Sequence, residues 1–333
     1  MTSEKSSDLN SKLKSQLNSH EPVMLEQIAQ CFTTVPPGVV VDATFGFGGH
    51  AKAILKANPS LQILGLDQDA DAIANAERMI ADDSSLHGRL TVRRVRFDSL
   101  SAVLEELSIK EISGALFDLG VSSPQLDIAQ RGFSYRNDGP LDMRMDQRGE
   151  LSAADVVNSY QESELAGIIT QNADERFARR IARAIVAARP ISTTTHLAEV
   201  IVAAIPAPAR RTGGHPAKRT FQAIRIEVNK ELEILARTLQ IAIDATKVGG
   251  RVAVLTYHSG ENRIVKQVFR SSEKDADELK VGSPFIHESQ LGTRHVSRVR
   301  IAQYPSEQEQ AQNRRAKSAR LRVIEKELAE ARG

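Results

Sequence analysis

The stretch that decides the fold class is Gly38-Val-Val-Val-Asp42-Ala-Thr-Phe-Gly46-Phe-Gly-Gly-His50. Its first five residues form a short apolar run, rich in β-branched side chains, which is typical of a buried strand. The glycines that follow predict a tight turn in which the backbone can approach a ligand. A helix is predicted from His50 to Ala57, and its first turn offers free N–H groups. In doubly wound sheets, ligands bind at such strand-to-helix turns.

Strands and helices keep alternating after this turn. Strands are predicted over 61–66, 90–95 and 112–117, and helices over 69–81 and 99–107. Continuous apolar strands separated by helices indicate a parallel sheet that is covered on both faces. The sequence therefore predicts an α/β, Rossmann-like fold with a mostly parallel sheet.

The alternation stops near Gln130 and returns after an insertion. Residues 131–145 show no regular period, and residues 152–204 are predicted to form one helix after another. A long helix over 222–246 and strands over 250–257 and 295–303 then resume the sheet pattern. We therefore predict a disordered leader (1–19), a sheet domain (20–130 and 222–304), an all-helical insert (131–221) and a basic C-terminal tail (305–333).

Composition excludes several classes of protein. Hydrophobic residues make up 41% of the 333 residues and charged residues 26%, which excludes a wholly disordered or fibrous chain. No apolar run approaches the roughly 18 residues of a membrane span, so no membrane partner is predicted. A single cysteine, Cys31, excludes an internal disulfide and favours a reducing, cytoplasmic compartment. The scattered histidines lack metal-ligand spacing, so no metal site is predicted.

Basic residues are concentrated in two segments, although the net charge is only +2. The run from Pro206 to Ile226 holds five basic residues and no acidic one, and the run from Arg294 to Lys326 holds nine basic and three acidic residues. Such patches can bind a polyanion locally. The alternative is that both are solvated faces.

Acidic residues follow the predicted strands. Asp67 ends the second strand, 21 residues after Gly46, and Asp118 ends the fourth, while Phe97 and Asp98 follow the third. The turn lacks the third glycine of the dinucleotide pattern Gly-x-Gly-x-x-Gly, which disfavours a nicotinamide cofactor. An acid at the end of the second strand can bind ribose hydroxyls, and an anionic rim suits a cationic ligand such as the sulfonium of S-adenosylmethionine. The alternatives are a purely structural turn and acids that only cap helices.

The segment Asp118-Leu-Gly-Val-Ser122-Ser123-Pro124-Gln125 follows the fourth strand. It resembles the acidic-x-x-x-Pro loops of amino-methyltransferases, which place hydrogen-bond acceptors beside an exocyclic NH2 group. An unspecialised Ser-Ser-Pro turn is the alternative.

Several long motifs together resemble one family, the 16S ribosomal RNA cytosine-N4 methyltransferases (RsmH, formerly MraW). The motifs run almost end to end along the chain: His20–Leu25, Asp42–His50, Asp118–Asp127, Arg131–Asp146, Ser152–Asn158, Arg219–Ile226, Tyr257–Ser259 and Ser318–Arg322. The resemblance implies a class I S-adenosylmethionine-dependent methyltransferase sheet with a helical insert that recognises RNA. It also implies N4-methylation of a cytidine at the peptidyl-tRNA site of the decoding centre, in an assembled or nearly assembled small subunit.

The resemblance also implies roles for individual residues. The expected contacts with S-adenosylmethionine are Gly48, Gly49, His50, Asp67, Phe97, Asp118 and Gln125. Asp118, Ser123 and Pro124 are the expected catalytic residues. The basic segments supply the candidate RNA contacts Arg210, Arg211, Lys218, Arg219, Arg314 and Arg315.

Two departures from the family pattern concern the loop after the fifth strand and the tail. Gly260 and Asn262 stand where the family has Leu and Asp, and Arg314 stands where it commonly has Pro. We predict that His258 orients its loop. Tyr135, Arg136 and Arg144 either clamp RNA or hold their own loop in place.

Three functions compete at this point. The chain is an RNA cytosine methyltransferase, a non-catalytic RNA-binding or ribosome-assembly protein on a methyltransferase fold, or a nicotinamide-dependent oxidoreductase. The sequence does not indicate an oligomeric state.

Overall fold

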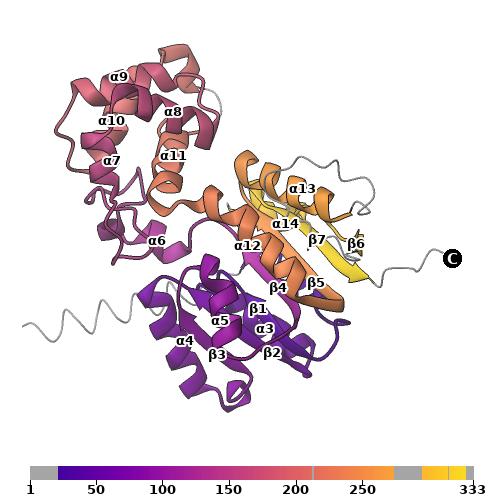
Figure 1. Cartoon of the computed structure of the whole chain (residues 1–333). Coiled ribbons are helices and arrows are strands. Elements are labelled where there is room, and N and C mark those ends of the chain that lie inside the picture. The colour runs from indigo at the N-terminus through magenta and orange to yellow at the C-terminus, as the bar shows by residue number, and fades with distance from the viewer. Residues whose placement is uncertain (1–21, 212–213, 274–294, 314, 328–333) are drawn as a thin grey trace, which may run out of the picture. The chain divides into compact units, whose positions relative to one another are not determined.

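The computed structural model describes residues 22–211, 214–273, 295–313 and 315–327, and Figure 1 shows the path of the chain. The predicted leader, 1–19, lies outside this range. Contacts within the chain define two compact units. We call Val23–Gly120 with Lys230–Gly333 the sheet unit, and Val121–Asn229 the helical unit. The predicted domain boundaries fell at 130 and 222, whereas the chain passes between the units at Gly120–Val121 and Asn229–Lys230.

The sheet unit contains strands and helices in alternation. Its strands are β1 (Gly38–Asp42), β2 (Leu61–Asp67), β3 (Leu90–Arg94), β4 (Ile112–Asp118), β5 (Thr246–Thr256), β6 (His295–Arg298) and β7 (Arg320–Glu327). Its α-helices are α2 (Leu25–Cys31), α3 (Gly49–Ala57), α4 (Ala70–Asp82), α5 (Leu100–Glu106), α12 (Glu231–Ala245), α13 (Ser259–Glu273) and α14 (Glu307–Gln312). Short 3-10 turns are η1 (Ser84–Leu86), η2 (Phe97–Ser99) and η7 (Ala316–Ser318).

The strand order explains where a ligand can bind. The strands of the sheet follow the order β3-β2-β1-β4-β5-β7-β6. Neighbours from β3 to β5 are parallel, with Val40 of β1 opposite Ile63 of β2 and Gly114 of β4. The order reverses between β1 and β4, because the chain adds β2 and β3 on one side and then crosses to the other. Ligands of open α/β sheets bind at this reversal, at the carboxyl ends of the strands.

Alternate residues of each strand enter two separate cores, one on each face of the sheet. Val40 and Leu116 pack in one core with α2 and α3, whereas their neighbours Val41 and Phe117 pack in the other. The second core receives α5, α12 and α13, which contribute Leu100, Leu239 and Val265 among others. The period of two along a strand produces this division. The result is a sheet covered on both faces, as predicted.

The C-terminal part of the sheet differs from the prediction. Residues 305–333 were expected to form a basic tail, but β7 pairs antiparallel with β5, so that Leu321 lies opposite Leu255. Leu321 and Val323 are buried, whereas Arg320 and Arg322 are only partly buried. The alternation of polar and apolar residues in Arg-Leu-Arg-Val at 320–323 is typical of a half-buried strand, so the sequence already contained a signal for β7. The expected strand over 295–303 is shorter, because β6 ends at Arg298.

The helical unit packs around its own core. Its helices are α6 (Ser123–Asp127), α7 (Ala153–Ser159), α8 (Glu162–Ala173), α9 (Ala178–Ala187), α10 (Thr194–Ala204) and α11 (Lys218–Asn229), with 3-10 turns η3 (Ala129–Arg131) and η4 (Ala207–Arg211). Ile169, Ile181, Leu197 and Phe221 are buried together at the centre. This all-helical insertion agrees with the helices predicted from the sequence.

The long helix expected over 222–246 is two helices. Lys230, between α11 and α12, has a φ of 54°, which is the left-handed region and ends a helix. The buried side chain of Asn229 accepts a hydrogen bond from Met145 N (2.8 Å) and donates one to Met143 O (2.8 Å). These bonds to a distant loop stop the helix at a place that local periodicity could not show.

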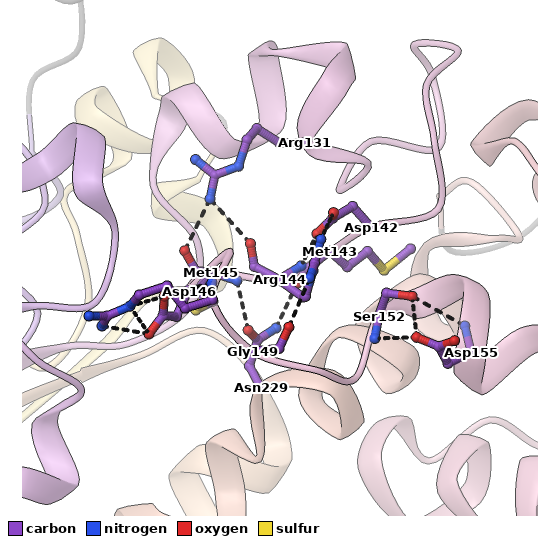
Figure 2. A network of polar contacts seen from close by, with 11 residues as sticks. Arg131, Asp142, Met143, Arg144, Met145, Asp146, Gly149, Ser152, Asp155 and Asn229 are labelled. Carbon is purple, nitrogen blue, oxygen red and sulfur yellow. Dashed lines mark hydrogen bonds and ion pairs between the residues drawn. The ribbon is translucent and has the colours of Figure 1, made fainter.

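The same loop is held by a polar network, which Figure 2 shows. Arg131 donates to the carbonyl oxygens of Arg144 and Met145, both at 3.2 Å. Arg144 donates to both carboxylate oxygens of Asp142 and, at 2.8 Å, to Gly149 O. Arg144 therefore holds its own loop in place, which favours that alternative over an RNA clamp.

Tyr135 and Arg136 are also engaged within the helical unit. The ring of Tyr135 stacks on His215, with centroids 4.5 Å apart, and the guanidinium of Arg136 lies over the Tyr135 ring, 5.7 Å from its centroid. Tyr135 further makes an edge contact with Phe221 at 5.8 Å. These contacts connect the loop to the start of α11.

Candidate functional site

Three aspartates meet at the carboxyl edge of the sheet unit. Asp42, Asp67 and Asp118 are the last residues of β1, β2 and β4, which are adjacent strands. Because parallel strands end at the same edge, these carboxyl groups lie around the start of the glycine-rich turn. The sequence predicted this placement for Asp67 and Asp118 and did not single out Asp42.

Hydrogen bonds tie the turn after β1 to both neighbouring strands. Ala43 N donates to Leu116 O (2.9 Å), and Phe45 N donates to Leu66 O (3.0 Å). Gly46 has a φ of 54°, and a Cβ atom built there would meet only Thr44 O, at 3.8 Å. The backbone of Gly46 is therefore open to an approaching ligand within the described part of the chain.

Gly48 has a different role from Gly46. A Cβ atom at Gly48 would lie 2.6 Å from Phe45 Cζ and 2.8 Å from Met79 Cε, and its φ is 73°. It immediately precedes α3, whose first residues are Gly49 and His50. This glycine lets Phe45 pack under the turn and exposes the free N–H groups of the helix start.

Asp67 fastens the turn to β2. Its Oδ2 accepts a hydrogen bond from Gly46 N and its Oδ1 accepts one from Asp69 N, both at 2.8 Å. Burial raises the pKa of Asp67 to about 6, despite these bonds. Each carboxylate oxygen has two lone pairs, so both can accept a further bond from a ligand hydroxyl.

Asp118 is the centre of a cluster that combines three strand ends. Tyr257, which follows β5, donates its hydroxyl to Asp118 Oδ1 at 2.7 Å. Asp118 N donates to Thr44 Oγ1 at 2.6 Å, and Asp118 Oδ2 lies 3.4 Å from His50 Nε2. Burial, followed by the charge of Asp118, raises the pKa of Tyr257 well above its ordinary value, so the phenol stays protonated and donates.

His50 is buried, and its ring nitrogens lack hydrogen-bond partners among the described residues. The residue is 6% exposed, and neither ring nitrogen makes a hydrogen bond within the described residues, although Nε2 lies close to Asp118. A buried polar atom without a hydrogen bond costs free energy, so such atoms often mark a binding site. The predicted residues Gly48, Gly49, His50, Asp67 and Asp118 thus lie together in the sheet unit.

The end of β3 contributes an aromatic ring and a paired acid. Phe97 is partly buried and makes an edge contact with Phe117, with centroids 5.9 Å apart. Asp98 accepts two hydrogen bonds from Arg96, and these bonds hold the pKa of Asp98 below its usual range. Asp98 is therefore bound to a neighbouring side chain, while Phe97 keeps a partly exposed face.

The predicted catalytic segment begins the helical unit. Ser123, Pro124 and Gln125 form the first turn of α6, although the side chain of Ser123 lies outside what the structure describes. Gln125 Oε1 accepts a hydrogen bond from Ser122 N at 3.0 Å. This bond caps the helix, so the Gln125 amide has a structural role that the sequence did not show. Gln125 is buried.

The candidate RNA contacts fall in both units. Arg210 donates to the carbonyls of Ile205 (2.7 Å) and Ala203 (3.2 Å) and so caps the end of α10. Lys218 and Arg219 are exposed at the start of α11, and Arg219 donates to Asp174 O at 3.2 Å. Arg315 belongs to the sheet unit. Arg314 lies outside the described residues, as does the side chain of Arg211.

The structure explains the departure from the family pattern in the loop after β5, at Gly260 and Asn262. Glu261 is buried and accepts hydrogen bonds from Tyr257 N (2.7 Å) and His258 N (3.2 Å), which fixes the position of Tyr257. A Cβ atom at Gly260 would lie 3.2 Å from the His258 ring, so glycine allows this close approach. Asn262 Oδ1 accepts from Arg322 Nε at 2.9 Å, a bond that an aspartate would also make.

A model of the MraW methylase family matches residues 17–327. The chain belongs to this family. It is 47% identical over 315 residues to ribosomal RNA small subunit methyltransferase H of Thermobifida fusca, covering 92% of this chain and 93% of that one. It is 48% identical over 313 residues to the protein of the same name from Acidothermus cellulolyticus, with the same coverage. An rRNA methylase structure from Streptococcus thermophilus matches 91% of this chain and 93% of that chain, at 11% identity and a TM-score of 0.36.

Family membership makes the chain a methylase with the class I, S-adenosylmethionine-dependent fold that the sequence predicted, and S-adenosylmethionine is its methyl donor. The residues of the site fit this group. Three carboxyl groups suit its cationic centres, the space beside Gly46 is open, and the buried ring of His50 has nitrogens to satisfy. Within the described ranges, no cluster of His, Cys, Asp and Glu suits a metal ion, and no helix is long and apolar enough to span a membrane.

Donor affinity should rise with pH between about pH 5 and pH 7. Burial raises the pKa of Asp42 to about 7 and that of Asp67 to about 6. The free protein therefore binds protons in this range that a cationic ligand must displace, and each pH unit below the pKa costs up to about tenfold in affinity. The same raised values mean that the stability of the free protein falls as pH rises from the unfolded pKa of 3.8 towards 7.

Calorimetric titration with S-adenosylmethionine across this range measures the effect. Asp42→Asn should flatten the pH dependence, because it removes the carboxyl group with the higher pKa. S-adenosylhomocysteine, which lacks the sulfonium charge, should show a smaller dependence. A wild-type affinity that does not change with pH would contradict this explanation.

Proposed function

We propose that this protein transfers the methyl group of S-adenosylmethionine to N4 of a cytidine at the peptidyl-tRNA site of the decoding centre in 16S ribosomal RNA. The acceptor is an assembled or nearly assembled small subunit in the cytoplasm. The observation that carries the proposal is the Asp118 cluster, which ends β4 and leads directly into the loop that resembles those of amino-methyltransferases. The names of the relatives support a ribosomal RNA of the small subunit as substrate.

Each residue of the expected donor site has a proposed role. Asp67 binds ribose hydroxyl groups with the lone pairs that Gly46 N and Asp69 N leave available. Phe97 offers its exposed face to the adenine. Gly48, Gly49, His50 and Asp118 line the remainder of the donor site, and Gln125 is a further proposed contact. The donor supplies an electrophilic methyl group.

The acceptor amine needs help from the protein. A nucleobase amine is conjugated with its ring and is a poor nucleophile, so acceptors that hold its N–H groups raise its reactivity. We place these acceptors at Asp118, Ser123 and Pro124. The cytosine must leave its stack to reach them, as in other enzymes that modify a base. Arg210, Arg211, Lys218, Arg219, Arg314 and Arg315 are the proposed contacts with the RNA backbone.

Nucleoside analysis tests the proposal directly. Small subunits from a strain that lacks the protein are incubated with the pure protein and S-adenosylmethionine, and their RNA is digested and analysed by mass spectrometry. N4-methylcytidine is the expected product. Methylation of carbon 5 or of a ribose hydroxyl would contradict the amine mechanism, and no methylation of any acceptor would favour a non-catalytic RNA-binding protein.

Ser123→Ala and Pro124→Ala should lower the rate of methyl transfer more than they weaken binding of donor or RNA. Ser123→Ala removes a hydroxyl that can accept an amine hydrogen, whereas Pro124→Ala keeps the backbone carbonyl but removes the ring that fixes φ and so positions that carbonyl. Acceptors of the amine hydrogens act most strongly when the nitrogen gains positive charge in the transition state, so their loss or displacement appears in kcat. Ser101→Ala and Pro59→Ala, at exposed positions of the sheet unit, are matched controls. Equal losses in kcat and in RNA affinity would instead assign the loop to binding.

A further inference from the structure

Two adjoining hollows lie at α13 in the sheet unit. One hollow, of about 570 Å³, is lined by residues of α13 that include Asn262, Lys266 and Arg270. A second hollow, of about 290 Å³, is lined by residues that include Tyr257, Tyr304 and Lys317. The two hollows share Ser259 and Asn262, so they adjoin, and we call the two together the groove.

The groove carries positive charge that the described residues do not neutralise. Lys266, Arg270 and Lys317 are exposed and make no ion pair with any described residue. Lys266 and Arg270 are four residues apart on α13, so they lie on the same face of the helix. The two acids of α13 are both engaged: buried Glu261 holds the Tyr257 loop, and Glu273 pairs with Arg298. An anion is the complementary ligand.

An exposed aromatic ring, that of Tyr304, lines the second hollow. Tyr304 is 56% exposed, the largest exposed fraction among the big hydrophobic side chains of the described residues. The guanidinium of Arg320 lies over this ring, 4.9 Å from its centroid. A ring supported by arginine on one face and open to solvent is the kind of platform on which unpaired bases stack.

One residue belongs both to the groove and to the candidate active site. Tyr257, which lines the second hollow, donates its hydroxyl to Asp118 at 2.7 Å. A polymer held in the groove is thus in contact with the residue that positions Asp118. Its polar lining of serine, asparagine and glutamine and its exposed ring suit a nucleic acid better than an acidic peptide, which has no bases to stack.

We infer that this groove binds the unpaired RNA segment next to the target nucleotide, with phosphates on Lys266 and Arg270 and one base stacked on Tyr304. The inference rests on the proposed function for the identity of the acceptor. It adds a second RNA-binding surface to the basic segment of the helical unit and places that surface on the sheet unit itself.

Binding of a fluorescent, single-stranded ribo-oligonucleotide of mixed sequence to the full chain tests this assignment by anisotropy. Tyr304→Ala should weaken binding roughly 5- to 150-fold, the usual range for removing one stacked base, whereas Tyr304→Phe should bind as the wild type does. The double variant Lys266→Gln, Arg270→Gln should reduce the slope of log affinity against log salt by about 0.7 for each phosphate that the protein no longer neutralises.

The control is Lys56→Gln, Lys110→Gln, which removes positive charge at exposed positions before β2 and β4, at the amino edge of the sheet. This control should leave the slope unchanged. The inference is wrong if Tyr304→Ala binds the RNA as the wild type does, or if the groove and control variants show the same decrease in slope. It is also wrong if labelled polyglutamate binds with the same dependence on Tyr304.

The outcome is separable from that of the proposed function. If the groove variants lose RNA affinity but the modified nucleoside is not N4-methylcytidine, the assignment of the groove to RNA binding is supported and the proposed reaction is wrong. If N4-methylcytidine forms and the groove variants bind RNA as the wild type does, the proposed reaction is supported and the groove does not bind RNA.

Discussion

Replacing Asp118 by alanine should lower kcat/KM for methyl transfer by about 10²- to 10³-fold, the range for one preorganised electrostatic group in an active site. Asp118 is positioned by Tyr257 Oη at 2.7 Å and by its own N–H on Thr44, and it lies beside the buried ring of His50. The substitution removes the carboxylate next to the donor site and leaves the Tyr257 hydroxyl without its acceptor. Saturating donor should not restore the rate, since the carboxylate is also a proposed contact of the amine.

Two further variants separate this effect from loss of structure. Tyr257→Phe keeps the carboxylate but removes one hydrogen bond that orients it, so we expect a smaller loss of rate. Asp98→Ala removes an acid that follows β3 and that Arg96 already pairs. It should retain most of the activity. If Asp98→Ala loses as much as Asp118→Ala, and thermal unfolding of both is unchanged, Asp118 has no special role.

The regular part of the fold could be predicted because its signals are local. Runs such as Gly38–Asp42 and Ile112–Asp118 are apolar almost throughout, as expected for strands that are buried on both faces. The structure differs from the prediction where a distant contact decides the outcome. The break at Lys230 depends on Asn229 bonding to Met143 and Met145, more than 80 residues away in the chain.

In the candidate site, too, local signals could be predicted from the sequence and distant contacts could not. The acids Asp67 and Asp118 could be placed from the sequence because a strand end fixes their position. The bond from Tyr257 to Asp118 joins residues 139 positions apart, and no spacing rule reports such a pair. For Arg210 and Gln125, the sequence suggested a ligand contact where the structure shows a bond within the protein. Their residue types suggested ligand contacts, while their side chains cap helices, and composition alone cannot distinguish the two roles.

The second large effect is expected at Asp67, where alanine should weaken binding of S-adenosylmethionine by roughly 10- to 150-fold. This range corresponds to the loss of one hydrogen bond to a charged group, about 1.5–3 kcal/mol. Two causes act together. The ligand loses its acceptor for ribose hydroxyls, and Gly46 N loses the 2.8 Å bond that holds the turn against β2. Calorimetry with the donor measures the sum.

Comparison with Asp67→Asn distinguishes the two causes. The amide oxygen can still accept from Gly46 N, so the turn stays in place, but the charge and one acceptor are removed. If loss of the ribose contact is the main cause, Asp67→Asn should weaken binding of the donor nearly as much as Asp67→Ala does. If the turn dominates, Asp67→Asn should bind almost as the wild type does, and Asp67→Ala should also unfold at a lower temperature. An unchanged donor affinity in both variants would remove Asp67 from the site, and the raised pKa of its carboxyl would then reflect burial alone.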